Sequence, residues 1–213
     1  MTIRFDVVRR PLSGAALLLL LAGPALAQDE GLYPEPSSPD AAFLRVHAPS
    51  GAAVAVGDQT LQPGEIGFTP YVEVAPGPVT VSVEGQETTV EPAPNTHYTF
   101  VAREEDGGKL LADGVTGSPA QADLVFYNLS DLDAVDVFVP SADAMAVEGV
   151  ASDAEASVAL RAPLTLDLQI RNGEDTLAEV SGVELVRSGG TSVVLSGEAG
   201  AYEAHAEQNT YAD

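Results

Sequence analysis

The chain has 213 residues, with 9 lysines and arginines against 32 aspartates and glutamates, a formal net charge of −23 and no cysteine. So acidic a surface repels polyanions, which excludes nucleic acid as a partner and makes direct contact with a uronic-acid polymer doubtful. The absence of cysteine excludes disulfides and thiolate metal sites.

Residues 1–27 have the pattern of a secretory signal peptide. A basic start ends with Arg9 and Arg10, the apolar run Ala15 to Ala22 follows, and Ala25 to Ala27 is a small-residue cleavage site. The paired arginines also allow twin-arginine export, although the proline that follows them favours general secretion. Because the run is shorter than the roughly 20 residues that span a bilayer, we expect a secreted protein without membrane insertion.

The rest of the chain is a series of short apolar or alternating runs separated by Gly, Pro, Asn and Asp. The clearest run, Leu164 to Ile170, turns four aliphatic side chains to one face, and this period of two is typical of half-buried β-strands. Strands so closely spaced predict an all-β sandwich. The expected strands are Ala42–Ala48, Tyr71–Ala75, Pro78–Glu84, His97–Ala102, Leu124–Tyr127, Ala134–Val139, Leu164–Ile170, Val183–Val186 and Thr191–Leu195.

The order of these runs repeats at an offset of about 80–90 residues, which predicts two tandem small β-sandwich domains, Ig-like or jelly-roll-like. In each half a proline opens a long alternating strand that ends in a glycine turn, from Pro78 in the first half and from Pro163 in the second. The predicted organisation is a signal peptide at 1–27, an extended Pro-rich segment at 28–41, a first sandwich at 42–112, a linker at 113–120, a second sandwich at 121–196 and a loose acidic tail at 197–213.

No catalytic motif is found, so we expect a protein that is not an enzyme. The histidines are His47, His97 and His205, and none has a serine nucleophile beside it in the sequence, although a triad can form at long range. The first two fall in expected strands, where a histidine is more often an ordinary strand residue than a catalytic one.

Metal and cofactor sites are not expected either. Asp131, Asp133 and Asp136 crowd one turn and the strand after it, and spaced carboxylates can hold calcium. This run lacks the glycine and the glutamate of the usual calcium loop, so a solvated turn is the favoured interpretation.

The segment after the cleavage site carries the one candidate site. Leu32, Tyr33 and Pro34 are an apolar group in an acidic, proline-rich stretch. Such an extended segment can dock on its own sandwich as an edge strand, or it can be offered to a partner as a strand. We predict that it binds a partner or locks the first domain.

The order of these features resembles the alginate O-acetyltransferase AlgF family. The resemblance lies in Glu30 to Pro34, the run Ala42 to Val46, the first half ending at His97 to Val101, and Asn128 to Ser130 opening the second half. It implies a periplasmic two-domain β-sandwich adaptor required for O-acetylation of an exported polysaccharide, alginate or a similar polymer. The companions it implies are a membrane-bound O-acyltransferase and periplasmic SGNH-type acetyltransferases, which perform the chemistry.

Two other classes of function stay open. A secreted carbohydrate-binding or cell-envelope β-sandwich module usually needs exposed aromatic platforms, and this chain has no tryptophan and 6% aromatic residues. An esterase or acetyltransferase acting alone would hydrolyse a generic acetyl ester. Fold alone does not choose between these classes.

Overall fold

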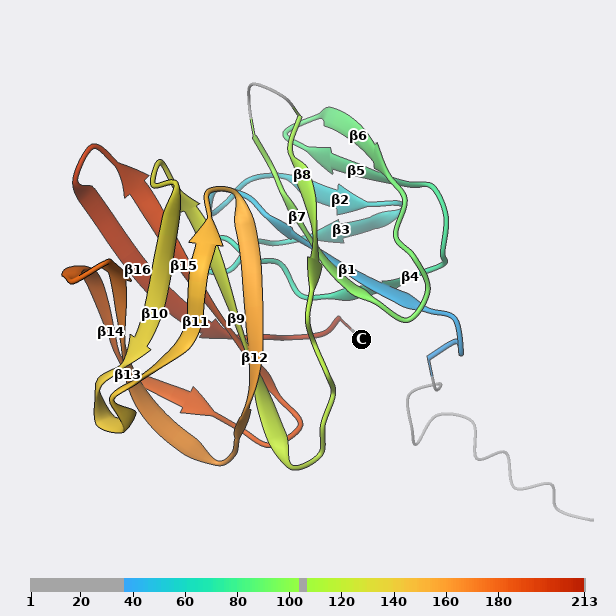
Figure 1. Ribbon diagram of the computed structural model, residues 1–213. Helices are drawn as coiled ribbons and strands as arrows, with labels where there is room; N and C mark the ends of the chain where they lie inside the picture. Colours follow the sequence, from blue (N-terminus) through green and yellow to red (C-terminus); the bar gives the residue numbers. More distant parts are fainter. Residues whose placement is uncertain (1–36, 104–106, 213) are drawn as a thin grey trace, which may run out of the picture. The chain divides into compact units, whose positions relative to one another are not determined.

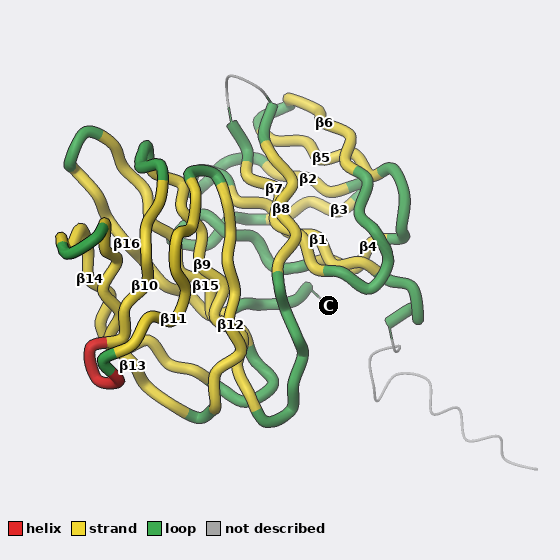
Figure 2. The backbone as a smooth tube through the Cα atoms, viewed as in Figure 1, coloured by secondary structure: helices red, strands yellow, loops and turns green. Residues whose placement is uncertain are grey.

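The computed structural model describes residues 37–103 and 107–212, and in these residues almost the whole chain is β-strand (Figure 2). The one helical element described is a single 3-10 turn at Pro140–Ala142. The described residues contain no helix long and apolar enough to cross a membrane. The predicted signal peptide lies outside this part of the chain, and so does the predicted Pro-rich segment up to residue 36; its residues 37–41 are described.

The first half folds into a sandwich of two four-stranded sheets, ordered β4-β1-β7-β8 and β3-β2-β5-β6 (Figure 1). Most of its strands are short, and three of them have three residues each. Its strands are β1 (Ala42–His47), β2 (Val54–Val56), β3 (Gln59–Leu61), β4 (Val72–Val74), β5 (Val79–Val83), β6 (Gln86–Val90), β7 (His97–Val101) and β8 (Lys109–Asp113).

The second half is a sandwich of longer strands, with sheets ordered β12-β9-β15-β16 and β11-β10-β13-β14. Its strands are β9 (Gln121–Ser130), β10 (Ala134–Val139), β11 (Ala144–Ala151), β12 (Ala154–Arg161), β13 (Leu164–Asn172), β14 (Asp175–Leu185), β15 (Gly190–Glu198) and β16 (Ala201–Gln208). Both sandwiches belong to one compact unit.

The two sandwiches have the same topology strand for strand. In each, the first strand runs parallel to the seventh, the seventh pairs with the eighth, and the second, third, fifth and sixth strands form the other sheet. The predicted all-β fold of two tandem sandwiches is therefore confirmed. The repeat explains why Pro78 and Pro163 precede matching strands, β5 and β13.

Alternation of side chains explains the core of each sandwich. In β13, Leu166, Leu168 and Ile170 are buried while the side chains between them face outward. The second core contains these residues with matching faces of β9, β10 and β15. The first core is built in the same way around Leu44, Val81 and their neighbours, and it contains fewer buried residues.

The end of the chain differs from the sequence prediction. We expected a loose acidic tail at 197–213, but β15 continues to Glu198 and Ala201–Gln208 forms β16, paired antiparallel with β15. The reason is an alternation of one tyrosine and two alanines with charged or polar side chains. Tyr202, Ala204 and Ala206 all pack against the second core.

Candidate functional site

The most distinctive place in the structure is the junction at which the two sandwiches meet. The outer face of the sheet β4-β1-β7-β8 contributes Val101 and Leu111, and the outer face of the sheet β12-β9-β15-β16 contributes Val125, Tyr127 and Val194. Together with Phe68 from the loop before β4, these side chains form a third apolar cluster. The central strands of both sheets are therefore buried on both faces.

Arg45 on β1 is the largest polar side chain of this junction, and it is 1% exposed. Its Nε donates to Thr99 Oγ1 at 2.9 Å, and its Nη2 donates to Tyr127 OH at 2.7 Å and Ser192 Oγ at 2.6 Å. Its Nη1 donates to Asn209 Oδ1 at 3.0 Å. One side chain of the first sandwich thus contacts β9, β15 and the end of the chain.

The charge of Arg45 is balanced by Asp113, at the end of β8, through shared hydroxyl groups. The Asp113 carboxylate accepts hydrogen bonds from Tyr71 OH, Thr99 Oγ1 and Tyr127 OH, each at 2.7 Å. Burial alone lowers the pKa of Arg45, but Tyr127, Tyr71 and Asp113 outweigh it and raise the pKa. Burial also raises the pKa of Tyr127. The network therefore holds a fixed guanidinium, neutral phenols and one carboxylate.

Aromatic rings enclose the guanidinium. Arg45 Cζ lies 4.2 Å from the ring centre of Phe68 and 4.4 Å from that of Tyr71. A desolvated cation over an aromatic face gains about 2 kcal/mol or more from the ring quadrupole. The rings thus compensate part of the loss of hydration that burial of Arg45 imposes.

A second polar contact joins the sandwiches at the turn between β11 and β12. Both Nη atoms of Arg103 bind the Asp153 carboxylate, and Lys109 Nζ donates to the Asp153 carbonyl oxygen at 2.9 Å. Both cations come from the first sandwich, which also supplies Arg45. Cations that are scarce in this acidic chain are therefore concentrated where the sandwiches meet.

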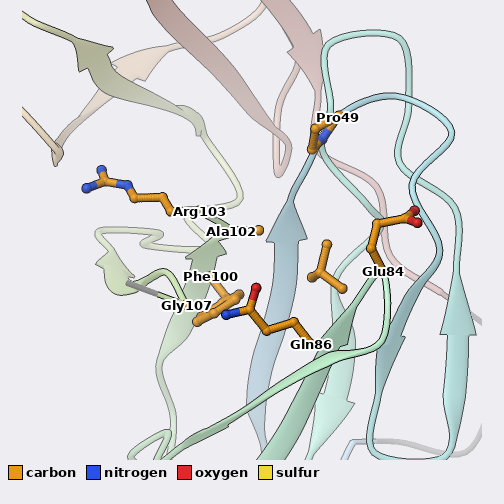
Figure 3. Close-up of a pocket in the computed structure, with 8 residues that line it drawn as sticks. Pro49, Glu84, Gln86, Phe100, Ala102, Arg103 and Gly107 are labelled. Carbon is orange, nitrogen blue, oxygen red and sulfur yellow. The ribbon is translucent and has the colours of Figure 1, made fainter. Parts of the chain in front are cut away.

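Two neighbouring pockets open beside the junction, and they share Pro49 and Ala102. Figure 3 shows the smaller one, with a volume of about 160 Å³, at the end of the first sandwich. Phe100 lines its apolar part, and Glu84 and Gln86 carry polar groups on its wall.

The larger pocket, with a volume of about 590 Å³, is lined by both sandwiches. It contains His47 and Glu65 from the first sandwich and Ser196 and His205 from the second. His47 is covered by the chain at Gly67, where an added Cβ would lie 2.6 Å from the Ala48 carbonyl oxygen. Burial lowers the pKa of His47 to about 4, so this imidazole is neutral at pH 7.

Of the histidines named from the sequence, His47 and His205 line the same larger pocket, whereas His97 lies elsewhere. His47 lies in the larger pocket against the ring of Phe68, at 4.7 Å between ring centres. His97 stacks on Phe43 at 4.7 Å, and the exposed His205 Nε2 lies 3.6 Å from Glu203 Oε2.

The acidic run named from the sequence serves turns. Asp131 accepts hydrogen bonds from the Ala199 amide and the Tyr202 hydroxyl, which lowers its pKa, and Asp136 accepts one from the Gly149 amide. Among the described residues, no group of three His, Asp or Glu side chains is placed to hold a metal ion. Leu32, Tyr33 and Pro34, the predicted partner site, lie outside the described residues.

Sequence reasoning missed the Arg45 network. One signal was present, because Arg45 is a lone charge within the otherwise apolar run that forms β1. A charge at such a position is either exposed or paired. Its partners, Tyr127, Ser192 and Asn209, lie in distant strands or beyond the last strand, so no local pattern identifies them.

Comparisons with known proteins give one family and one solved structure to report. No curated protein sequence matches significantly. A solved structure, CBMbc (family CBM26) from Eubacterium rectale Amy13K in complex with maltoheptaose, is 11% identical, with a TM-score of 0.30 over 81% of this chain and 98% of that one. The family model described as "Alginate O-acetyl transferase AlgF" matches residues 15–193. Because this match covers most of the chain, the protein belongs to the AlgF family and takes part in alginate O-acetylation.

Proposed function

We propose that this protein is a non-catalytic adaptor in the periplasm that organises the acetyltransferase subunits of an O-acetylation system for exported alginate. Its membership of the AlgF family supports a role in that process. In this proposal a membrane-bound O-acyltransferase and periplasmic SGNH-type acetyltransferases carry the acetyl group. The adaptor holds them at a fixed spacing.

The observation that carries the proposal is the buried junction. An adaptor must present two binding faces in one fixed relation, and here the guanidinium of Arg45 is hydrogen-bonded to both sandwiches. Buried charged networks of this kind are costly to break, because a lone charge would remain without a partner. The junction also leaves the outer sheet of each sandwich free to meet a subunit.

The two outer faces differ in chemistry. On the first sandwich, β5 and β6 present the exposed hydroxyls of Thr80 and Thr89, which lie directly opposite each other. On the second, Arg171 lies 3.5 Å above the ring of Phe138, which is paired with the exposed Met145. Arginine, methionine and aromatic residues are enriched in protein interfaces, so the second face is the better candidate for a tight subunit contact.

The proposal is tested first in a strain that lacks the gene. We expect the acetyl-ester content of the exported alginate to collapse while the yield of polymer persists, and the wild-type gene to restore acetylation. Unchanged acetyl content would exclude a required role in O-acetylation.

Co-purification with tagged acetyltransferase subunits tests the adaptor role itself. With the double variant Phe138→Asp and Arg171→Glu, we expect the amount of one co-purified subunit to fall at least tenfold. Thr80→Arg with Thr89→Arg, on the other sandwich, is the matched variant and should retain that subunit. Equal retention by both double variants would exclude the second sandwich as a binding face.

The same preparation tests the remaining sequence prediction and the alternative function. Leu32→Asp with Tyr33→Ala is expected to abolish complex assembly with the fold intact, as judged by circular dichroism. A carbohydrate-binding module would instead retain the exported polymer in a pull-down with purified protein, without any acetyltransferase subunit.

A further inference from the structure

The last four described residues pass from the second sandwich to the first: the Asn209 amide still donates to the Gly190 carbonyl oxygen at 2.8 Å, and Thr210 to Ala212 then pair with Tyr71. β16 ends at Gln208, and residues 209–212 then lie along the edge of the sheet β4-β1-β7-β8, next to Tyr71. Figure 2 shows this end of the chain as loop after β16. We call residues Asn209 to Ala212 the strap.

The strap is held by backbone pairing at a sheet edge. The Tyr71 amide donates to the Thr210 carbonyl oxygen at 2.8 Å, and the Ala212 amide donates to the Tyr71 carbonyl oxygen at 2.8 Å. These two bonds form a parallel bridge between Tyr71 and Tyr211. An extended peptide that adds itself to a sheet edge in this way is a general mode of peptide recognition.

Two side chains of the strap fill specific positions. Tyr211 stacks on Tyr71 at 5.4 Å and meets the ring edges of Phe43 and His97 at 5.8 and 5.9 Å. Its hydroxyl lies 3.1 Å from His97 Nε2.

Two residues earlier, on the same face of the strap, Asn209 Oδ1 accepts hydrogen bonds from Arg45 Nη1 and from Ser192 Oγ. The edge thus recognises two side chains of the strap: an oxygen acceptor and, two residues later, an aromatic ring with a hydroxyl.

The strap is also short and only half covered. Tyr211 remains 51% exposed, and the side chain of Thr210 faces solvent. Short segments outside the cores that stay partly exposed open at lower free energy than core strands do. Opening of the strap would expose the edge of Tyr71 and the rings of Phe43 and His97, and it would leave Arg45 Nη1 without its acceptor.

We propose that this edge is a peptide-recognition site, filled by the chain's own residues 209–212 as an intramolecular ligand, which an extended segment of a partner polypeptide enters by displacing the strap. The partner segment it fits carries an asparagine or a carboxylate two residues before a tyrosine. This inference does not depend on the partner being an acetyltransferase subunit.

The test uses a labelled peptide with the sequence of residues 207–213 and a variant that ends at Gln208. We expect the shortened chain to bind the peptide, and the full chain to bind it at least tenfold more weakly because its own strap fills the site. A Tyr211→Ala peptide should bind the shortened chain at least tenfold more weakly. A Thr210→Ala peptide is the matched control and should bind like the wild-type peptide, because that side chain is exposed.

Failure to bind, or equal binding of the Tyr211→Ala peptide, by a folded shortened chain would overturn the proposal. Dimerisation through exchanged C-termini, seen by light scattering, would overturn it as well, because the occupant would then be a second copy. If the shortened chain does not fold, the full-length Tyr211→Ala variant replaces it. That variant must bind the wild-type peptide more tightly than the unchanged full chain does.

Discussion

The two sandwiches share one topology but differ in how far each supports itself. In the first, β2, β3 and β4 have three residues each, whereas the strands of the second have six to eleven. The second sandwich also joins its sheets at one edge, where Thr191 and Gln208 both donate to the Glu184 carbonyl oxygen. The two sandwiches therefore share a topology but not the same internal stability, and the stability of the first sandwich depends more on the junction.

The largest expected effect comes from breaking the junction at Arg45. Arg45→Ala leaves Asp113 buried without its compensating cation, and loss of one partner of a buried charged pair costs about 3–5 kcal/mol of unfolding free energy. Urea denaturation measures this loss. The exposed Arg161→Ala is the control and should change stability by less than about 0.5 kcal/mol. A loss below about 1 kcal/mol for Arg45→Ala would show that the network contributes little.

A matched pair of core variants compares the two sandwiches directly. Val81 in β5 and Leu168 in β13 occupy equivalent strands, and both are buried. Leu168→Ala is expected to cost about 3 kcal/mol, and the smaller deletion Val81→Ala about 2 kcal/mol. Because the junction couples the sandwiches, each variant should unfold in one calorimetric transition. Two separate transitions in the wild-type protein would contradict this coupling.

His47 gives the junction a dependence on pH. Its pKa in the folded protein is about 4, below the ordinary value of 6.5, because burial disfavours the charged imidazole. Between pH 4 and pH 6.5, His47 is protonated in the unfolded chain but neutral in the folded protein. The contribution of neutral His47 to the unfolding free energy is therefore complete above pH 6.5 and falls as the pH drops towards 4.

The loss amounts to about 3 kcal/mol across that window. We compare the unfolding free energies of the wild type and His47→Gln at pH 7 and at pH 4.5. Because the carboxylates titrate in both proteins, the difference between the two isolates the contribution of His47. We expect the difference between the two proteins to change with pH, and a constant difference would refute the assignment.

The smallest expected effect is at the contact between Arg103 and Asp153. Asp153→Asn removes the charge that Arg103 binds but keeps a residue type that tolerates the left-handed backbone at φ 58°. Partly exposed ion pairs contribute up to about 1 kcal/mol, so the loss should be of that size and should shrink in 1 M salt. Asp143→Asn, at φ 48° on an exposed turn, is the matched control and should have no measurable effect.

Local patterns predicted the strands with a clear apolar or alternating run, but they missed β3, β6, β8, β11, β12 and β16 and they failed where pairing is distant. The run Leu164 to Ile170 falls within β13, because a strict period of two needs only one buried face. The strand β16 was missed because two of its three inward side chains are alanines, and Glu203 and His205 separate the three.

The junction was beyond such reasoning. The hydrogen-bond partners of Arg45 lie 54, 82, 147 and 164 residues further along the chain. Apolar runs without alternation, such as Leu124 to Tyr127, do indicate burial on both faces, but they do not say what covers the second face.

The distance from Arg45 to Asn209 also bears on how the molecule is made. Since the donor lies 164 residues before its acceptor, the guanidinium cannot complete its hydrogen bonds until Asn209 has been synthesised. A chain that ends early, even with all sixteen strands present, keeps a buried cation with one acceptor missing. A product that stops between Gln208 and Asn209 therefore has every described strand but lacks this acceptor, so it is less stable and more exposed to proteolysis than a chain that includes Asn209.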